Sequence, residues 1–490
     1  MAICKFSSLL RQLNFLKTLA VLSIITPATI RAVPINNYQD PVIFHTVLGS
    51  DKFYSPTQKA SLTFHLSPFY QHTKSASRPD GVKTSNGNVH GPWNMAGIFL
   101  NAPADISTGL GVKVPKVMQD SFTATKTNVN TYFQGTLPNN TTLDQAFNQE
   151  LIPYQNALYQ NVTLRYEKMG LRGQLNFDLG AGLGMAIKGG IVNMKSRAEA
   201  FVLQEKFAIE AGIIPAPTGS SFAVLTGDDL KKAKTLYDTL LSPAARRNIF
   251  AALNLDLNDF ETSDFEDLFA NIYWHVPIKI KDNGEHIFNI VPYLSVGASA
   301  PLGRDRNPNK LFAVINGNDG FSGFTAEAAL ALDFPDMMQL SFGGGTTIYS
   351  SRTLANYRIP TSNNQSGIYP WVTNITRAPG PLWYVNISMK ADNIMSKKDI
   401  PNFSVYFDYV YAQHKHDKFT ISGQQTTAPS LTTLPGMLEA DSSWKAQTLH
   451  AGVKCALSKN VALTFAAQKS LPGARTYRPT TLLGGLVMNF

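Results

Sequence analysis

Residues 171–179 read Leu-Arg-Gly-Gln-Leu-Asn-Phe-Asp-Leu, and this stretch decides the fold. Its odd-numbered positions are apolar or glycine, and its even-numbered positions are Arg172, Gln174, Asn176 and Asp178. Successive side chains of a β-strand point to opposite faces, so one face is apolar and the other is strongly polar. The segment is therefore predicted to be an amphipathic strand.

The same two-residue period recurs along the whole chain. The runs are about ten residues long, the length that a tilted strand needs to cross a bilayer. Strands of soluble β-sandwiches are usually about five or six residues long, so run length favours a membrane barrel over a soluble all-β fold. Strands are predicted at 60–71, 162–180, 183–195, 266–281, 286–300, 323–334, 337–350, 381–392, 402–414, 445–457, 459–469 and 480–490.

The connections between these strands alternate between short and long. Short ones, such as 180–182 and 335–336, follow long ones, such as 72–161 and 196–265. Outer-membrane barrels combine tight periplasmic turns with long outer loops. The chain is therefore predicted to be all-β, a transmembrane antiparallel up-and-down β-barrel of about twelve strands. A further hairpin within 93–114 would give fourteen strands, or that segment folds into the lumen as a plug.

The N-terminus has the features of an export signal. A positively charged stretch precedes a short apolar run and small residues, so 1–32 is predicted to be a signal peptide. The formal charge of +9 then loses four basic residues and becomes +5, which is modest for a chain of 490 residues and argues against nucleic-acid binding. Residues 33–59 would form a periplasmic N-terminal segment, with a plug as one alternative, and 60–490 the barrel. Cys455 would be the only cysteine left, so no internal disulfide is expected.

The final segment ends on an aromatic residue. Gly485, Met488 and Phe490 match the C-terminal assembly signal of bacterial outer-membrane proteins, while Leu483 stands where a polar residue is commoner. The chain therefore resembles porin-like outer-membrane β-barrel proteins at the level of the class, without a specific family. The resemblance implies a location in the cell outer membrane, with membrane lipid and the barrel-assembly machinery as partners.

Charged residues on the polar face are candidates for lining the lumen. A ring of like charge would select ions, whereas here both signs occur with a slight positive excess. That excess favours anions weakly, and pairing of these charges across the lumen is the alternative. The candidates are Arg172, Asp178, Lys188, Lys279, Glu327, Lys390, Asp408 and Lys454.

Aromatic residues near the predicted strand ends suggest how the barrel sits in the membrane. Phe69, Tyr349, Trp383 and Trp444 fall near outer ends, where rings are expected at the membrane interface.

No motif for catalysis, nucleotide binding or a paired-cysteine metal site is found, so neither an enzyme nor a cofactor is predicted. Residues 225–262 have a helical stripe within the loop insert near 200–262, which would constrict the pore or cap it. The leading hypothesis is a porin-like channel or uptake protein for passive passage of small solutes. The alternative is a surface adhesin or receptor that acts through its long outer loops.

Overall fold

The computed structural model describes residues 61–90, 93–94, 159–202 and, with several gaps, 227–490. The signal peptide predicted at 1–32, the segment 33–59 and most of the additional hairpin predicted within 93–114 lie outside the described residues. Only β4 (Trp93–Asn94) is described from that hairpin, and it pairs with β5 at the edge of the sheet rather than within the ring.

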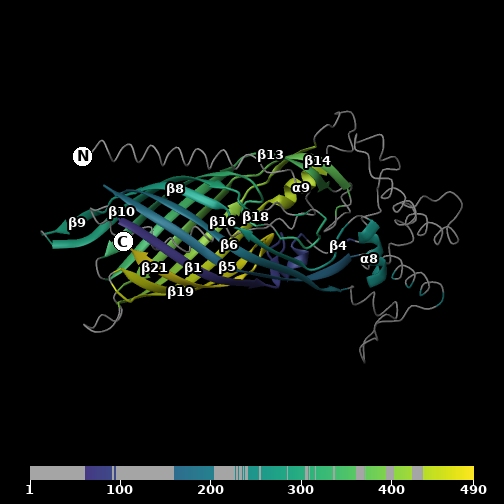
Figure 1. The fold of residues 1–490 in the computed structure, drawn as a ribbon, viewed down its shortest axis with the longest axis horizontal. Helices are drawn as coiled ribbons and strands as arrows, with labels where there is room; N and C mark the ends of the chain where they lie inside the picture. Colours follow the sequence, from purple (N-terminus) through teal and green to yellow (C-terminus); the bar gives the residue numbers. More distant parts are fainter. Residues whose placement is uncertain are drawn as a thin grey trace, which may run out of the picture.

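The described chain forms a closed antiparallel ring of 12 strands, in which each strand pairs with its neighbours in sequence. The predicted up-and-down barrel is therefore confirmed, and each predicted range overlaps one strand of the ring (Figure 1). β1 pairs with β21 and closes the ring, with Thr63 opposite Asn489. In ring order the strands are β1 (Ser61–Thr73), β5 (Tyr159–Gly180), β6 (Leu183–Val202), β8 (Leu268–His275), β10 (Glu285–Ala300), β11 (Gly323–Phe334), β12 (Met338–Tyr349), β15 (Leu382–Ala391), β16 (Asn402–His414), β18 (Trp444–Ala456), β19 (Val461–Ala474) and β21 (Thr480–Asn489).

Smaller elements extend the ring at both ends. A three-stranded sheet of β13 (Arg352–Ile359), β14 (Trp371–Ala378) and β17 (Lys418–Ile421) belongs to the long connections, as does α9 (Leu434–Ser442). Helix α8 (Pro243–Ala252) lies within the segment predicted to be helical. Among the described residues, no helix is both long enough and apolar enough to cross a membrane. The remaining elements are β2 (Ser75–Ser77), β3 (Lys83–Ser85), η2 (Asn86–Asn88), β7 (Phe260–Phe265), β9 (Ile278–Asp282) and β20 (Thr476–Tyr477).

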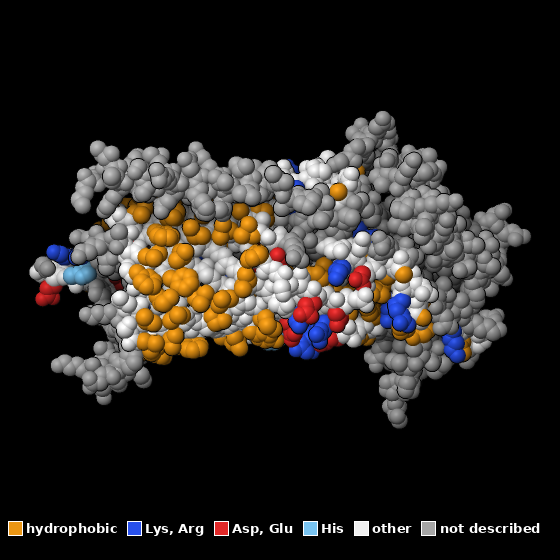
Figure 2. Space-filling model, in the orientation of Figure 1, with side chains coloured by type: hydrophobic (Ala, Val, Ile, Leu, Met, Phe, Trp, Pro, Cys, Tyr) orange, Lys and Arg blue, Asp and Glu red, His pale blue; other side chains and the backbone are white. Residues whose placement is uncertain are grey.

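The two faces of the barrel strands differ as the sequence period predicts. In β18 the side chains alternate between buried and more exposed along its outer half, and the buried ones include the polar Thr448 and His450. Apolar side chains gather in a broad belt on the face of the barrel that Figure 2 shows. Exposed members of this belt include Ile191, Phe265, Ile272, Trp274, Leu294, Val296, Leu330, Phe342, Val385, Ile387, Phe407, Phe465 and Leu482.

β5 and β6 are much longer than a membrane requires, with 22 and 20 residues. A strand needs about 9–11 residues to cross a bilayer, so this hairpin rises well beyond the apolar belt. The outward face changes character beyond Ile191, where Lys195 pairs with Glu261 at 2.7 Å and Lys74 pairs with Glu199 at 2.9 Å. Figure 2 shows charged side chains gathered just past the edge of the belt. The ring therefore has a membrane section and a taller polar section on one side.

Three of the predicted interfacial aromatic residues face the lumen instead. Phe69 and Trp444 are each only 5% exposed, and Trp444 stacks on His414 with ring centroids 5.8 Å apart. Tyr349 shares the inner face of β12 with Thr347, and its ring centroid lies 6.2 Å from that of His414. The prediction failed for these three because nearness to a strand end does not specify the face. Trp383 contacts Tyr411 as a tilted ring pair at 5.3 Å.

Candidate functional site

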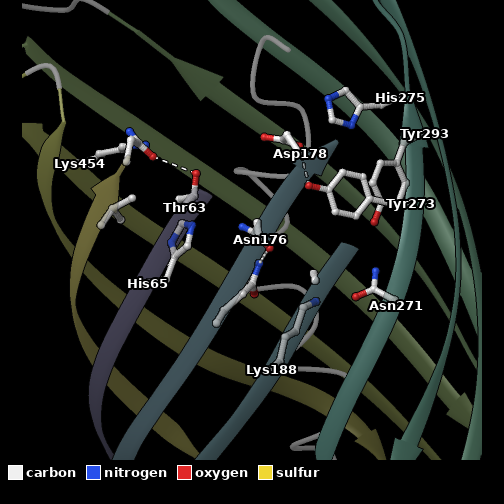
Figure 3. Close-up of a pocket in the computed structure, with 14 residues that line it drawn as sticks. Thr63, His65, Asn176, Asp178, Lys188, Asn271, Tyr273, His275, Tyr293 and Lys454 are labelled. Atoms are coloured by element: carbon white, nitrogen blue, oxygen red, sulfur yellow. Dashed lines mark hydrogen bonds between the residues drawn. The ribbon is translucent and has the colours of Figure 1, made fainter. Parts of the chain in front are cut away.

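The lumen contains a cavity in the half of the barrel nearest the short turns. The empty space between its lining residues, counted together with open solvent beside it, amounts to about 630 Å³. Figure 3 shows side chains from several strands converging on this space. The lining residues are mainly polar side chains of β1, β5, β6, β8, β10, β18 and β21: Thr63, His65, Gln174, Asn176, Asp178, Ala186, Lys188, Asn271, Tyr273, His275, Tyr293, Lys454, Val487 and Asn489.

One wall of this lumen cavity is formed by three rings that stack pairwise on one another. The centroid of Tyr273 lies 5.5 Å from that of His275 and 6.0 Å from that of Tyr293, and the His275 and Tyr293 centroids are 6.5 Å apart. This stack forms because Tyr273 and His275 are two residues apart on β8, while Tyr293 of β10 lies directly opposite His275. The Tyr273 hydroxyl donates to Asp178 at 2.7 Å, which ties the stack to β5.

Both oxygens of the Asp178 carboxylate accept hydrogen bonds. Tyr273 donates to Oδ1, and the Ser61 hydroxyl donates to Oδ2 at 2.9 Å. On the adjoining wall the Gln174 amide donates to Asn176 Oδ1 at 2.6 Å. Gln174 is 7% exposed, and its Oε1 has no hydrogen-bond partner among the described residues. The cavity therefore retains a buried acceptor that a solute could satisfy.

A buried ion cluster lies further along the inner face of β5. Glu266 receives two bonds of 2.7 Å from Arg172, and Lys168 approaches its Oε1 at 2.7 Å. The Arg172 guanidinium also lies over the Phe69 ring at 4.1 Å. Lys168, Arg172 and Glu266 are almost fully buried, so their charges depend on one another for stabilisation. This cluster therefore lies on the inner face between the cavity and the outer loops.

The opposite wall carries its own polar groups. Tyr384 donates to Glu327 at 2.6 Å. Asp408, His450 and Gln468 follow one another across β16, β18 and β19, and each is 1% exposed. Polar side chains therefore occupy the inside of the ring on several sides.

Six of the eight predicted lumen-lining residues lie inside the ring. Asp178, Lys188 and Lys454 line the cavity, whereas Arg172, Glu327 and Asp408 are buried elsewhere along the inner face. Lys390 shares the face of Ser388 but contacts Asp392 at 3.1 Å, just beyond the end of β15.

Lys279 was predicted to line the lumen, and that prediction is wrong. The segment predicted as one strand at 266–281 is interrupted by Pro277, which cannot donate to the strand ladder. Lys279 therefore lies on β9, which pairs only with β10 among the described strands. Its side chain is exposed on a ribbon that projects past the rim (Figure 1).

The outer loops are fastened together by one buried arginine. Arg377 of β14 donates to Asp319 Oδ2 at 2.7 Å and to Asp417 Oδ2 at 2.6 Å, and these aspartates belong to two other connections. Burial opposes the charge on Arg377, yet the two carboxylates hold the pKa of this guanidinium above its ordinary value. The connection carrying Asp319 also reaches inward, because Asn318 bonds to Asp267 and Ser299 at the outer ends of β8 and β10. We call Arg377, Asp319 and Asp417 the loop clamp.

A group of aromatic rings packs together around Phe312. Phe312 is fully buried and stacks on Trp93 at 6.3 Å, and Phe201 of β6 lies at the same distance from Phe312. Arg246 of α8 lies over the Phe201 ring at 4.5 Å. The insert near 200–262 was predicted to constrict the pore or cap it, and that stays a prediction. Of the ring residues described at this end, the most buried are Phe312 and Phe321, which are 0% and 1% exposed.

Sequence reasoning missed Glu266 and the loop clamp. Glu266 stands next to Asp267, and this acidic pair interrupts the alternation just before β8, which is the one signal that pointed to it. Nothing local marks Arg377, because its partners come from distant connections. Among the described residues, no group of three or more His, Cys, Asp or Glu side chains is placed to hold a metal ion.

Comparison with known proteins gives structural similarity without a family. No family model matches the chain, and no curated protein matches it. The COG4313 outer membrane channel from Pseudomonas putida F1 aligns over 89% of this chain and 98% of its own, at 10% identity and a TM-score of 0.42. The translocator domain of autotransporter NalP from Neisseria meningitidis aligns over 94% of this chain and 100% of its own, at 8% identity and a TM-score of 0.34. The monoaromatic hydrocarbon channel CymD aligns over 67% of this chain and 76% of its own, at 8% identity and a TM-score of 0.25.

The architecture itself is decisive for the class. A closed ring of tilted strands with an apolar outside and a polar inside is the arrangement of outer-membrane β-barrels. The predicted class is confirmed on that ground.

Proposed function

We propose that the protein is an outer-membrane channel that lets small hydrophilic solutes cross passively. The observation that carries this proposal is the polar cavity inside a ring whose outside is apolar. A polar lumen replaces part of the solute's hydration and so lowers the cost of crossing hydrocarbon. Twelve-stranded barrels are narrow, so side chains and loops decide what passes.

The outer loops support a gated rather than a permanently open path. The loop clamp joins three connections, and the buried rings of Phe321 and Phe419 lie against its guanidinium. Passage to the cavity from outside would require these loops to separate. The channel is therefore proposed to have a low resting conductance that rises when the loop clamp is released.

Paired cysteine substitutions test whether the lumen is the path. In a Cys455→Ser background, Asn271→Cys places a thiol in the lumen cavity, whereas Ile272→Cys places it on the outer belt, where Ile272 is 54% exposed. A water-soluble thiol reagent should reduce the current in planar bilayers for Asn271→Cys only. No current in any variant, with the barrel still heat-modifiable in gels, would refute transport and leave surface adhesion as the remaining prediction.

A further inference from the structure

Neutral polar side chains form a continuous row across one wall of the lumen cavity. Thr63 of β1 lies directly opposite Asn489 of β21 on one side and Asn176 of β5 on the other. Ala186 of β6 lies opposite Asn176, and Asn271 of β8 lies opposite Ala186. Residues directly opposite on neighbouring strands share a face and have Cβ atoms about 5 Å apart, so the register itself brings these groups together. We call Asn489, Thr63, Asn176 and Asn271 the polar row, and all four line the cavity.

The polar row and the neighbouring Gln174 keep hydrogen-bonding groups that the described residues do not use. The Gln174 amide nitrogen donates to Asn176 Oδ1 at 2.6 Å, which leaves the Asn176 amide nitrogen and Gln174 Oε1 without partners in the described chain. The Asn271 amide nitrogen donates to the Ser295 hydroxyl at 2.9 Å, and Asn271 Oδ1 has no partner among the same residues. These three side chains therefore still offer a donor and two acceptors. Asn176 and Asn271 lie around the same cavity (Figure 3).

The charged residues around the cavity are already engaged with other groups of the protein. Both oxygens of the Asp178 carboxylate accept hydrogen bonds, from Tyr273 and Ser61. Lys188 and Lys454 likewise interact with other groups. A charged solute would therefore have to compete for these side chains, and burying a charge without a partner of its own is costly. The open hydrogen-bonding capacity of the cavity lies on neutral amides instead.

Hydroxyl groups match what the polar row leaves open. A hydroxyl group donates and accepts, so it can bond to an amide oxygen or to an amide nitrogen. Asn176 and Asn271 are two strand spacings apart, about 10 Å between their backbones, with the small side chain of Ala186 between them. One hydroxyl group cannot contact both amides, whereas a solute with hydroxyl groups on several carbons can.

We infer that the lumen cavity binds small neutral solutes with several hydroxyl groups, such as monosaccharides and cyclic polyols, through the polar row and Gln174. The inference rests on the proposed channel function, since it names the class of solute that the cavity would receive. Binding at this cavity would favour polyols over apolar or charged solutes of the same size.

Binding in detergent tests the ligand class without requiring conductance. Isothermal titration of the refolded protein with myo-inositol should show binding that does not change with salt, because the solute is neutral. Cyclohexanol, which has the same ring and a single hydroxyl group, should bind about tenfold more weakly or worse. Equal affinity for these two probes, or no myo-inositol binding, would overturn the inference.

A second pair of probes tests the preference for neutral solutes. D-glucuronate and D-glucosamine add a negative and a positive charge to the D-glucose ring, and neither should bind more tightly than D-glucose. Tighter binding of either charged sugar, or a D-glucose affinity that falls in high salt, would show that free charges of the cavity select the solute, and the neutral class would be wrong.

Matched variants locate the binding. Asn176→Leu and Asn271→Leu remove the amides at similar size and should each weaken myo-inositol binding about three- to tenfold. Asn176→Ala and Asn271→Ala remove the same groups without adding apolar bulk and should give the same loss, which keeps the test valid if a leucine variant does not refold. The control is Asn193→Leu, on the outer face of β6, where Asn193 bonds to Ser263 at 3.0 Å.

The variants and the current separate this inference from the channel itself. Unchanged affinity in the folded Asn176 and Asn271 variants, or an equal loss in Asn193→Leu, would overturn the location. A barrel that conducts without binding myo-inositol would refute only the ligand class, and one that binds it without conducting would refute only the channel.

Discussion

Replacing Arg377 with methionine should release the outer loops while leaving the barrel intact. Methionine removes the guanidinium but preserves much of the side-chain length, and it leaves Asp319 and Asp417 buried without their shared cation. Breaking a buried ion pair by removing one partner costs about 3–5 kcal/mol. That range corresponds to an increase of about 10²- to 10⁴-fold in the population of opened loops.

Hydrogen exchange followed by mass spectrometry measures this opening directly. The amides of β14 should exchange faster by that factor, while those of β18 should keep their protection because they belong to the closed ring. Single-channel conductance of the same variant should rise. The control is Arg197→Gln, which removes an exposed pair with Asp259 and should change little. If β14 exchanges no faster in Arg377→Met than in this control, the loop clamp does not hold the loops.

Three further substitutions test other parts of the structure. Leu294→Arg, on the outer belt, should destabilise folding into lipid vesicles by about 2–4 kcal/mol in denaturant titrations, and an unchanged midpoint would place that face away from lipid. Burial raises the pKa of Asp441, but contacts from His90, Arg475 and Tyr369 outweigh this and leave that pKa below its ordinary value of 3.8. The ionised Asp441 carboxylate therefore stabilises the fold fully above pH 3.8, and this stabilisation is lost as the pH falls through the lowered pKa. The denaturation midpoint of the outer loops should drop in acid, and it should drop less for Asp441→Asn than for wild type, because the loop clamp carboxylates titrate in both. Gly182→Ala should lower refolding yield more than Gly180→Ala, because both have positive φ but a Cβ at Gly182 would lie 2.0 Å from the His275 carbonyl oxygen.

The ring of strands could be predicted because its causes are local. Period-two alternation sets the faces of each strand, and turns such as Gly180–Gly182 set where strands end. Antiparallel neighbours joined by short turns then leave little freedom in strand order. The break in the strand predicted at 266–281 was also visible, because Pro277 lies inside that range.

The specific ion pairs inside the barrel and between its outer loops could not be predicted from the sequence. Arg172 contacts Glu266 because β6, the neighbour of β5, pairs with both β7 and β8 and so places Glu266 between them. That placement depends on the register of three strands. The loop clamp joins positions 58 and 40 residues apart in sequence, within connections that have no period. The sequence shows whether each inward-facing side chain is positive or negative, but it does not show which side chain each one pairs with.

The pairing of β1 with β21 differs from every other contact in the ring. All the other neighbours are consecutive strands, whereas Thr63 and Asn489 are separated by 426 positions. Contacts so distant in sequence are the slowest to form, so this junction should be completed after the hairpins have assembled. Until then both edges expose unpaired backbone groups, and the terminal Phe490 amide still lacks its bond to the Leu62 carbonyl. An unfinished cylinder would thus stay open along the single line between β1 and β21.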